Sequence, residues 1–310
     1  MSVYHGHSSL PEAARGAVLA LGNFDGVHRG HAAVIGQARS LASPLDRQAG
    51  AAVFSPHPRI FFQPDGDPFA LMNEAQRVRA LQSEGAQLVH HIVFDHALSQ
   101  MSPEAFVDEV LHHGLGAAGI VTGADFCFGK GRAGTAEDLQ RLCAERAITC
   151  RIAEAVSAHG AAGKISSSDV RQALREGDPA RAAALLGRPF AIEGAVTKGD
   201  QRGRTIGFPT ANVALGPYVR PAFGVYATRS RLEDGRVIPG VANLGRRPTV
   251  EGTEARLEIH LFNFDEDLYG RTLETGLITF IRPEKKFDGL DQLKAQIAED
   301  SQAAREILAP

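Results

Sequence analysis

The chain has 310 residues, of which 44% are hydrophobic and 22% are charged. A chain of this length usually divides into more than one core, so we expect two domains. The 33 basic and 36 acidic side chains give a net charge of −3, which argues against nucleic acid as a partner. Three cysteines without a CxxC pair indicate reduced thiols, and no secretory signal or membrane span is evident. We therefore expect a cytoplasmic protein that contacts no membrane, and the question of a homo-oligomer stays open.

The first half of the sequence alternates between short apolar runs and longer helical patterns. The predicted strands are residues 16–21, 50–54, 88–94, 120–122 and 148–153. The predicted helices are residues 30–41, 74–83, 103–112 and 135–145. Strands that alternate with crossover helices form a parallel sheet, so we predict an α/β domain that binds ligands at the carboxyl ends of its strands.

The pattern changes after two further helical segments, at residues 168–175 and 179–186. Short strand-like runs separated by turn residues then cover residues 191–196, 210–213, 224–230, 237–242, 256–264 and 273–281. A final amphipathic stretch at residues 290–308 predicts a C-terminal helix. Several short strands closed by turns predict a small β-barrel. We place the domain boundary near Gly187, which gives domains at residues 1–186 and 187–310.

A segment rich in glycine and histidine, LGNFDGVHRGH at residues 21–31, follows the first predicted strand and opens the first helix. A helix N-terminus offers free N–H groups to anions, and glycines let a phosphate approach the backbone closely. His28 and His31 face the same side of the helix, where they can donate hydrogen bonds to an α-phosphate. Taken alone, an HxxH pair can also be a metal pair or chance, although no third ligand is evident nearby.

The HxGH signature within GNFDGVHRGH resembles the nucleotidyltransferase superfamily. Its FDGVHRGH form is similar to the adenylyltransferase domain of bacterial bifunctional riboflavin kinase/FAD synthetases. The resemblance implies a Rossmann-like parallel sheet in which His28 and His31 are catalytic. It also implies an ATP-binding set in this domain, which comprises Gly22, Asn23, Phe24, Asp25, Gly26, Gly30, Asp125, Ser167, Ser168 and Arg171.

Two further segments carry the same resemblance. VTGADFCFG at residues 121–129 is similar to a family segment that lines the nucleotide and flavin site, although Cys127 replaces a bulkier polar residue. KISSSDVR at residues 164–171 offers hydroxyl groups and the Arg171 guanidinium to phosphate. Serines are also preferred helix N-caps, which in isolation explains them equally well. The family usually has Thr at Ser168, a change that keeps the hydroxyl.

Two phosphate-binding patterns are rejected on context. GLGAAG at residues 114–119 fits GxGxxG, but it follows a helical pattern and precedes a strand, the reverse of a dinucleotide fingerprint. Gly114 therefore indicates the end of a helix. FGKG at residues 128–131 lacks the glycine and hydroxyl positions of a P-loop.

A second candidate site begins at residues 199–212, a run dense in glycine and arginine that suits phosphate binding. Thr210 and Asn212 share one face of a predicted strand, and their side-chain oxygens suit Mg²⁺ held together with ATP. On the strand at residues 256–262, Glu258 lies on the face opposite to the leucines, where it can accept a proton from an attacking hydroxyl. Considered singly, all three are more often surface residues.

The resemblance extends through this half, because GFPTAN, GVANLGRRPT, LEIHLFNFDEDLYG and FIRPEKKFDGL occur in the order of the riboflavin kinase domain. It implies a six-stranded β-barrel with a C-terminal helix, Mg²⁺ at Thr210 and Asn212, and Glu258 as the residue that activates the ribityl 5′-hydroxyl. It implies flavin contacts from Arg282 and Phe287. The implied kinase nucleotide-binding set comprises Gly199, Arg204, Gly207, Pro209, Thr210 and Asn212.

The sequence therefore predicts a bifunctional transferase. Riboflavin and ATP give FMN in the C-terminal domain, and FMN and a second ATP give FAD and pyrophosphate in the N-terminal domain. Mg²⁺ accompanies ATP, and no bound redox cofactor is required. The alternatives are an adenylyltransferase for another substrate and a non-catalytic flavin-binding regulator.

Overall fold

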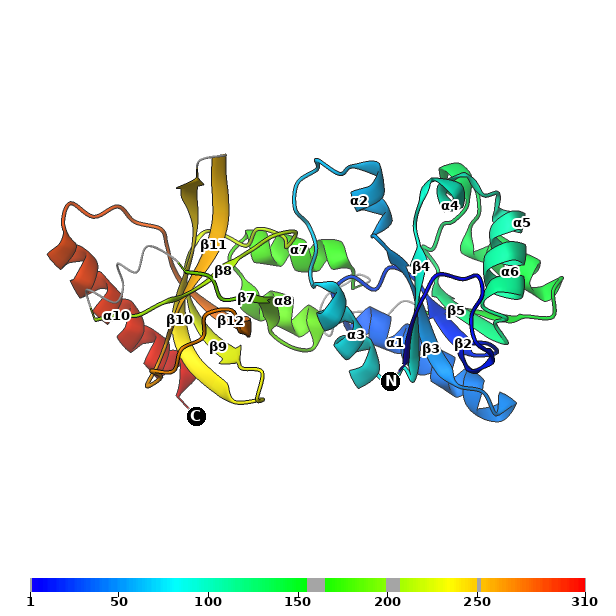
Figure 1. Ribbon diagram of the computed structural model, residues 1–310, viewed down its shortest axis with the longest axis horizontal. Helices are drawn as coiled ribbons and strands as arrows, with labels where there is room; N and C mark the ends of the chain where they lie inside the picture. Colours follow the sequence, from blue (N-terminus) through cyan, green and yellow to red (C-terminus); the bar gives the residue numbers. More distant parts are fainter. Residues whose placement is uncertain (1, 155–164, 199–206, 250–251, 310) are drawn as a thin grey trace. The chain divides into compact units, whose positions relative to one another are not determined.

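The computed structural model describes residues 2–154, 165–198, 207–249 and 252–309, with side chains at all of these except 247–249 and 252–254. Two compact units emerge (Figure 1). The N-terminal unit comprises Met1–Gly66 and Glu74–Ile165, and the C-terminal unit comprises Asp67–Asn73 and Ser166–Pro310. None of the helices within the described ranges is both long and apolar enough to cross a membrane.

The N-terminal unit is built on a parallel sheet. Its described strands are β1 (Ser2–His5), β2 (Val18–Leu21), β3 (Ala49–Ser55), β4 (Leu88–Val93), β5 (Gly119–Gly123) and β6 (Thr149–Ala153). They lie in the order β1-β4-β3-β2-β5-β6. From β2 the chain first builds the sheet toward β3 and β4, and later returns to place β5 on the other side of β2. The switch point between β2 and β5 is where such sheets bind ligands.

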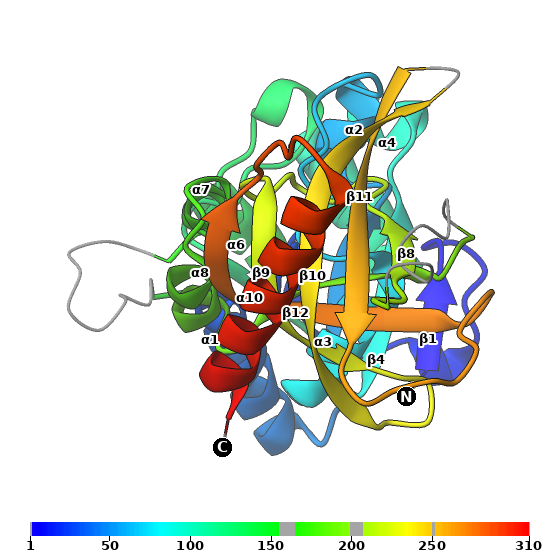
Figure 2. The same ribbon diagram turned by 90° about the vertical axis from the view of Figure 1, so that its left-hand side faces the viewer.

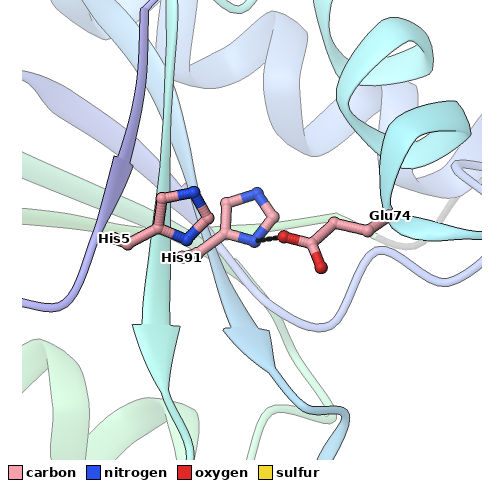
Figure 3. A group of neighbouring side chains, drawn as sticks. All are labelled: His5, Glu74 and His91. Atoms are coloured by element: carbon pink, nitrogen blue, oxygen red, sulfur yellow. Dashed lines mark ion pairs between the residues drawn. The ribbon is translucent and has the colours of Figure 1, made fainter.

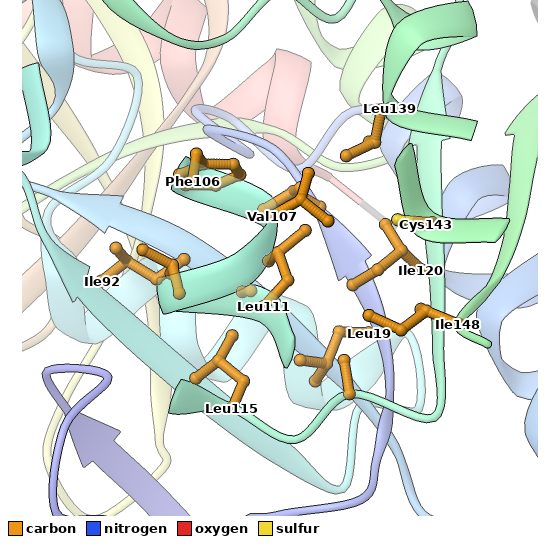
Figure 4. Close-up of a cluster of buried hydrophobic side chains, with 14 of the residues drawn as sticks. Leu19, Ile92, Phe106, Val107, Leu111, Leu115, Ile120, Leu139, Cys143 and Ile148 are labelled. Atoms are coloured by element: carbon orange, nitrogen blue, oxygen red, sulfur yellow. The ribbon is translucent and has the colours of Figure 1, made fainter. Parts of the chain in front are cut away.

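Helical segments cover both faces of this sheet. They are η1 (Glu12–Ala14), α1 (Arg29–Ala42), η2 (Ser43–Leu45), α2 (Pro58–Phe62), α3 (Glu74–Ser83), α4 (His96–Gln100), α5 (Pro103–Ala105), η3 (Phe106–Gly114), η4 (Lys130–Arg132) and α6 (Ala136–Ala144). Helix α1 packs on β2, β3 and β5. On the other face, η3 and α6 bury their apolar side chains against the sheet, and Figure 4 shows Val107 and Leu111 of η3 among Leu19, Ile120 and Leu139.

The predicted strands and long helices of this half are confirmed, with two differences. The sequence pattern does not predict β1, a short edge strand that pairs in parallel with β4. A strand at the edge of a sheet has a neighbouring strand on one side only, and it is less buried than the inner strands. For this reason β1 lacks the apolar run that marks the inner strands. The predicted α-helix at 103–112 is α-helical only at its start and continues as the π-helix η3.

Gly114 ends this π-helix, as the rejection of the dinucleotide motif predicts. An added Cβ there would lie 2.6 Å from the carbonyl oxygen of His7 and 2.8 Å from that of Glu109. The glycine is therefore needed for a close backbone approach. The GxGxxG match has a packing role in the turn before β5 and does not open a helix.

The C-terminal unit contains an antiparallel barrel. Its described strands are β7 (Phe190–Ala195), β8 (Ala211–Ala214), β9 (Gly224–Arg231), β10 (Val237–Thr249), β11 (Gly252–Leu261) and β12 (Thr272–Pro283). They lie in the order β7-β12-β9-β10-β11-β8, and a bridge from Thr197 to Asn212 brings the two edges together. The predicted fold class, a parallel α/β domain followed by a small barrel, is confirmed.

Three helices complete this unit: α7 (Ser167–Arg175), α8 (Pro179–Leu186) and α10 (Leu290–Leu308). Helix α8 packs on β7 and β12, and α10 lies across β9 and β10, as Figure 2 shows. Ala304 and Leu308 of α10 join Val225, Ala227 and Phe262 in one apolar cluster. The predicted bounds of α8 and α10 agree with the structure.

Candidate active sites

The loop between β2 and α1 has an unusual backbone. Phe24, Gly26 and Val27 have φ angles of 51°, 89° and 38°, in a region that side-chain-bearing residues rarely adopt. Two of the three carry bulky side chains, and both of these side chains are 1% exposed. Burial of Phe24 and Val27 offsets the backbone strain, which is typical of loops that present their N–H groups to a ligand.

His28 is the N-cap of α1. Its backbone is extended, and its Nδ1 accepts a hydrogen bond from the backbone N–H of His31 at 3.2 Å. A ring nitrogen that accepts has no hydrogen, so the hydrogen of the neutral ring lies on Nε2. In the neutral ring, the cap therefore sets the tautomer with its hydrogen on Nε2.

His31 completes the pair one helical turn later. The two imidazole rings stack with centroids 3.6 Å apart, and the edge of Phe24 packs on His31 at 5.0 Å. Gly30 makes this stack possible, because an added Cβ would lie 3.1 Å from two atoms of the His28 ring and 3.4 Å from the Ile165 carbonyl oxygen. The structure thus brings His28 and His31 together, as the motif predicts.

Arg77 of α3 contacts the backbone of this loop, although no sequence motif points to it. The side chain is buried, and its Nη1 donates to the carbonyl oxygens of Asn23 at 3.3 Å and Phe54 at 3.4 Å. Burial lowers the pKa of Arg77, while the nearby carboxylates of Glu74 and Asp25 act in the opposite direction. Asp25 is itself buried. This buried cation ties the loop to the end of β3.

The loop after β5 lies beside the first loop, because β2 and β5 are neighbours in the sheet. Thr122 at the end of β5 is buried, and its hydroxyl donates to the Leu21 carbonyl oxygen at 3.1 Å. Asp125 follows on the exposed side of this edge. The structure therefore places Asp125 at the carboxyl edge that also carries the HxGH loop.

The serine-rich segment begins α7 in the C-terminal unit. Ser166 is the N-cap, and it forms a capping box with Asp169. Ser167 and Ser168 are the first two helical residues, so the capping role falls on the serine before them. The Nε of Arg171 donates to the Phe69 carbonyl oxygen at 2.8 Å, and its guanidinium stacks on the Phe69 ring.

In the barrel, three polar side chains form a row across adjacent strands. Glu258 of β11 is the register partner of Asn212 on β8 and of Asn243 on β10. Directly opposite residues share one face of a sheet. Leu257 and Ile259, the neighbours of Glu258 along β11, are fully buried in the barrel interior. The alternation predicted for this strand holds, and Glu258 lies on the outer face between two carboxamides.

The segment before β8 is held by the same strand. His260 Nδ1 lies 2.9 Å from the Pro209 carbonyl oxygen, and its ring packs edge-on against Phe208 at 5.5 Å. The Asn212 Nδ2 donates to the Thr210 carbonyl oxygen at 3.4 Å. Gly207 has a φ of +87°, a backbone that glycine tolerates. The other two predicted residues of this set, Gly199 and Arg204, lie outside the described residues.

A second carboxylate lies beside this row. An added Cβ at Gly245 would clash with the Glu284 carboxylate and lie 3.1 Å from Asn243 Nδ2. Glu284 follows β12 and is exposed. The Glu284 carboxylate and the Asn243 carboxamide thus both lie close to Gly245, which brings a second acidic group to the face that carries Glu258.

The two predicted flavin contacts lie at the junction of barrel and helix. Arg282 of β12 forms a bidentate ion pair with the buried Asp300 of α10, through Nε at 2.8 Å and Nη2 at 2.7 Å. Its guanidinium is 5.9 Å from the centre of the Phe287 ring. The arrangement shows a clear structural role for Arg282, which fastens α10 to the barrel.

Comparison with known proteins agrees with this division into two sites. A model of the FAD synthetase family matches residues 10–169, and a model of the riboflavin kinase family matches residues 186–308. The bifunctional riboflavin kinase/FMN adenylyltransferase of Escherichia coli strain K12 is 40% identical over 99% of this chain and 97% of its own length. The chain belongs to the bifunctional riboflavin kinase/FMN adenylyltransferase family.

Other relatives extend the comparison. The Bacillus subtilis member of the family is 36% identical over 97% of this chain and 96% of its own length. A crystal structure described as a macrolide-efflux protein from Streptococcus pneumoniae superposes with a TM-score of 0.85 at 31% identity, covering 98% of this chain and 99% of that one. The fold of the whole chain is therefore one that has been solved before.

Family membership makes this chain an ATP-dependent transferase of flavin cofactor synthesis. The FAD synthetase match contains the HxGH loop, and the riboflavin kinase match contains Thr210, Asn212 and Glu258. Adenylylation of FMN therefore belongs to the N-terminal domain and phosphorylation of riboflavin to the C-terminal domain. The prediction of a boundary at residue 187 stays a prediction, as do the individual residue roles.

Proposed function

We propose that Glu258 is the base that activates riboflavin in the kinase domain, and that His28 and His31 contact the α-phosphate of ATP in the FAD synthetase domain. The row Asn212–Glu258–Asn243 carries the first assignment, since it sets one half-buried carboxylate between two uncharged side chains in the strand register. A carboxylate can accept the proton of an attacking hydroxyl group.

In the kinase reaction, the ribityl 5′-hydroxyl oxygen attacks the γ-phosphorus of ATP. Its proton passes to the Glu258 carboxylate, the new O–P bond forms, and the bond to the ADP oxygen breaks. Asn212 and Asn243 flank the base in the strand register. The products are FMN and ADP.

The donor set at the start of β8 fits Mg²⁺. Since Asn212 Nδ2 donates to the Thr210 carbonyl oxygen, its Oδ1 is the atom that remains for a metal. With the Thr210 hydroxyl this gives two hard oxygen ligands, which Mg²⁺ prefers together with phosphate oxygens. When bound, Mg²⁺ neutralises phosphate charge; Thr210 and Asn212 would hold it, and the fixed carboxamide orients that ligand atom.

In the FAD synthetase reaction, a phosphate oxygen of FMN attacks the α-phosphorus of ATP, and pyrophosphate leaves. The Nε2–H of His28 is set by the helix cap as a donor to the α-phosphate, where charge grows in the transition state. His31 stacks on His28 and shares this face. The strained loop at residues 22–27 supplies N–H groups to the remaining phosphates.

The remaining sequence predictions form part of the same proposal. Asp125, Ser167, Ser168 and Arg171 stay assigned to ATP, and Arg282 and Phe287 to the flavin. Riboflavin, FMN and ATP are the substrates, with no bound redox cofactor. We keep the cytoplasm as the expected compartment, since Cys127, Cys143 and Cys150 are free thiols.

A time course tests the proposal directly. The purified chain is incubated with riboflavin, ATP and Mg²⁺, and the flavins are separated by chromatography. We expect FMN to appear first and FAD to follow. With FMN supplied in place of riboflavin, FAD should form without a lag. FMN without FAD would reject the assignment of the N-terminal site, and no conversion would favour a flavin-binding regulator.

A further inference from the structure

Three titratable side chains that have no role in the sites assigned above meet on one face of the parallel sheet. His5 at the end of β1 is the register partner of His91 on β4, so their rings lie side by side with centroids 5.0 Å apart. The side chain of Glu74, the first residue of α3, extends to the same two rings. Figure 3 shows the two imidazole rings side by side and the Glu74 carboxylate directed at His91.

The ligand atoms of these side chains converge. One nitrogen from each histidine and one Glu74 oxygen all lie within 4.8 Å of one another. The His91 Nδ1 is 2.6 Å from Glu74 Oε1. Two imidazoles and a carboxylate at such spacing match the ligand set of three-ligand zinc sites, which leave a further position for water.

His91 is the buried member of the group. It is 1% exposed; its Nδ1 faces the Glu74 carboxylate at 2.6 Å, and its Nε2 has no hydrogen-bond partner among the described residues. A buried imidazole normally has such a partner. Burial lowers the pKa of His91 to about 4, against the opposing effect of Glu74, so the ring is neutral at physiological pH. A neutral imidazole is the form that coordinates metals.

A positive charge lies close to these three side chains. Arg77 lies one helical turn after Glu74, and its positive charge acts on His91. Only the Glu74 carboxylate offsets that charge among the three ligands. His90 and Tyr4, the neighbours along each strand, stack with each other on the opposite face of the sheet and take no part.

We propose that His5, Glu74 and His91 form a binding site for one divalent transition metal of the zinc class. Imidazole ligands select Zn²⁺, Co²⁺ and related ions, whereas Mg²⁺ prefers oxygen. The site is therefore chemically distinct from the magnesium site proposed at Thr210 and Asn212. A bound ion would join β1, β4 and α3, and would tie down a short N-terminal edge strand.

Zinc titration of the whole chain tests this proposal. The protein is stripped of metal, kept free of ATP, and held in an excess of Mg²⁺ so that oxygen sites are occupied. Bound Zn²⁺ is measured by calorimetry for the native chain and for His5→Ala and Glu74→Gln. Both substituted residues are exposed, so these variants should fold.

We expect the native chain to bind one Zn²⁺ equivalent more than either variant, or to bind that equivalent at least about tenfold more tightly. Zn²⁺ should also raise the melting temperature of the native chain and not that of the variants. The stacked pair His28 and His31 is retained in all three proteins, so any zinc it holds cancels in the comparison.

His112→Ala on η3 is the matched control, because it removes an imidazole that lies beside another, His113, at a ring distance of 4.8 Å. It should bind Zn²⁺ like the native chain. Co²⁺ should give visible absorption bands of a nitrogen-coordinated ion that weaken in His5→Ala. Equal stoichiometry and affinity in the native chain, His5→Ala and Glu74→Gln would overturn the proposal.

Discussion

The residues proposed for adenylylation that have the most distinctive local geometry lie within residues 21–31. The row proposed for the kinase reaction draws on β8, β10 and β11, which are far apart in sequence. In the first site, one loop with left-handed backbone angles and one helix cap orient two rings. In the second, strand register sets a carboxylate between two carboxamides. A local site tolerates little change in its own backbone, while a register site depends on the pairing of the whole barrel.

The largest expected effect comes from the register site. Glu258→Gln keeps the shape and the strand pairing but removes the proton acceptor. FMN formation should fall by about 10²- to 10⁴-fold, the usual contribution of a general base. FAD formation from supplied FMN should be unchanged, since it takes place in the other domain. Both rates are measured by chromatography of the flavins.

Glu306→Gln, which alters an exposed glutamate of α10, is the matched control and should leave both rates as they are. Native-like FMN formation by Glu258→Gln would remove the base assignment. Loss of both reactions together would instead indicate a folding defect, which circular dichroism would reveal.

Two substitutions can separate the capping role of His28 in the local site from its proposed role as a hydrogen-bond donor. Asn is a preferred N-cap, so His28→Asn should keep α1 intact, whereas His28→Ala should lose about 1 kcal/mol of stability. Both variants remove the imidazole donor, and both should lower FAD formation about 10²- to 10³-fold. Thermal unfolding and the FMN-to-FAD rate are the two measurements.

FMN formation should remain at the native level in both variants and is the internal control. If His28→Asn made FAD as fast as the native chain, the ring would be a cap alone. Should only His28→Ala lose activity, helix stability and not the Nε2 donor would be the cause.

The contrast between the sites also explains what the sequence revealed. The HxGH loop was legible because its residues are contiguous and its glycines and histidines have few other reasons to occur at that spacing. Glu258 was placed on the correct strand face by simple alternation. Asn243 was not singled out, since its place beside Glu258 follows from the register of β10 and β11. Pairing between distant strands has no local signal.

Arg77 and His5 were missed for related reasons. Arg77 lies in an ordinary helical pattern, and only the tertiary fold brings it under Asn23 and Phe54. His5 lies on an edge strand too short to show a period. Arg282 is the opposite case, because the motif does single it out. The motif predicts a flavin contact, whereas in the structure its guanidinium donates to Asp300. A sequence motif identifies a residue but does not show which residues it contacts in the folded chain.

A smaller effect is expected from crowding the local site. Gly30→Ala puts a Cβ 3.1 Å from the His28 ring and should displace the ring by a few tenths of an ångström. Misplacement of a catalytic group by 1 Å can cost about 10²-fold, so we expect a loss of about tenfold in FAD formation. The kinase reaction should not change.

Gly36→Ala in the same helix is the control, because a Cβ at that position meets nothing within 4 Å. Replacing a glycine inside a helix should stabilise the protein by about 0.5–1 kcal/mol without loss of FAD formation. Equal FAD synthesis by Gly30→Ala and Gly36→Ala would show that the stacked arrangement of His28 and His31 is not needed for the reaction.

The smallest effect tests whether Arg282 serves the flavin as well as the fold. Asp300→Asn leaves Arg282 in place but removes the negative charge of its partner, and it replaces one of the two accepting oxygens by an NH₂ group that cannot accept. Hydrogen bonds to charged groups contribute about 1.5–3 kcal/mol to stability, so the attachment of α10 to the barrel should weaken. Backbone amides of α10 should then exchange with deuterium faster, and those of β2 in the other domain serve as the reference.

If Asp300 orients Arg282 for the flavin, loss of their ion pair should also raise the KM for riboflavin. A loss of about 1 kcal/mol in binding free energy corresponds to a rise of about fivefold. Glu299→Gln, which removes the exposed acid next to Asp300, should change neither quantity. Faster exchange in α10 with an unchanged KM would restrict Arg282 to fastening the helix. The flavin contact would then have to come from a residue that the register of the barrel, and not the motif, brings to the site.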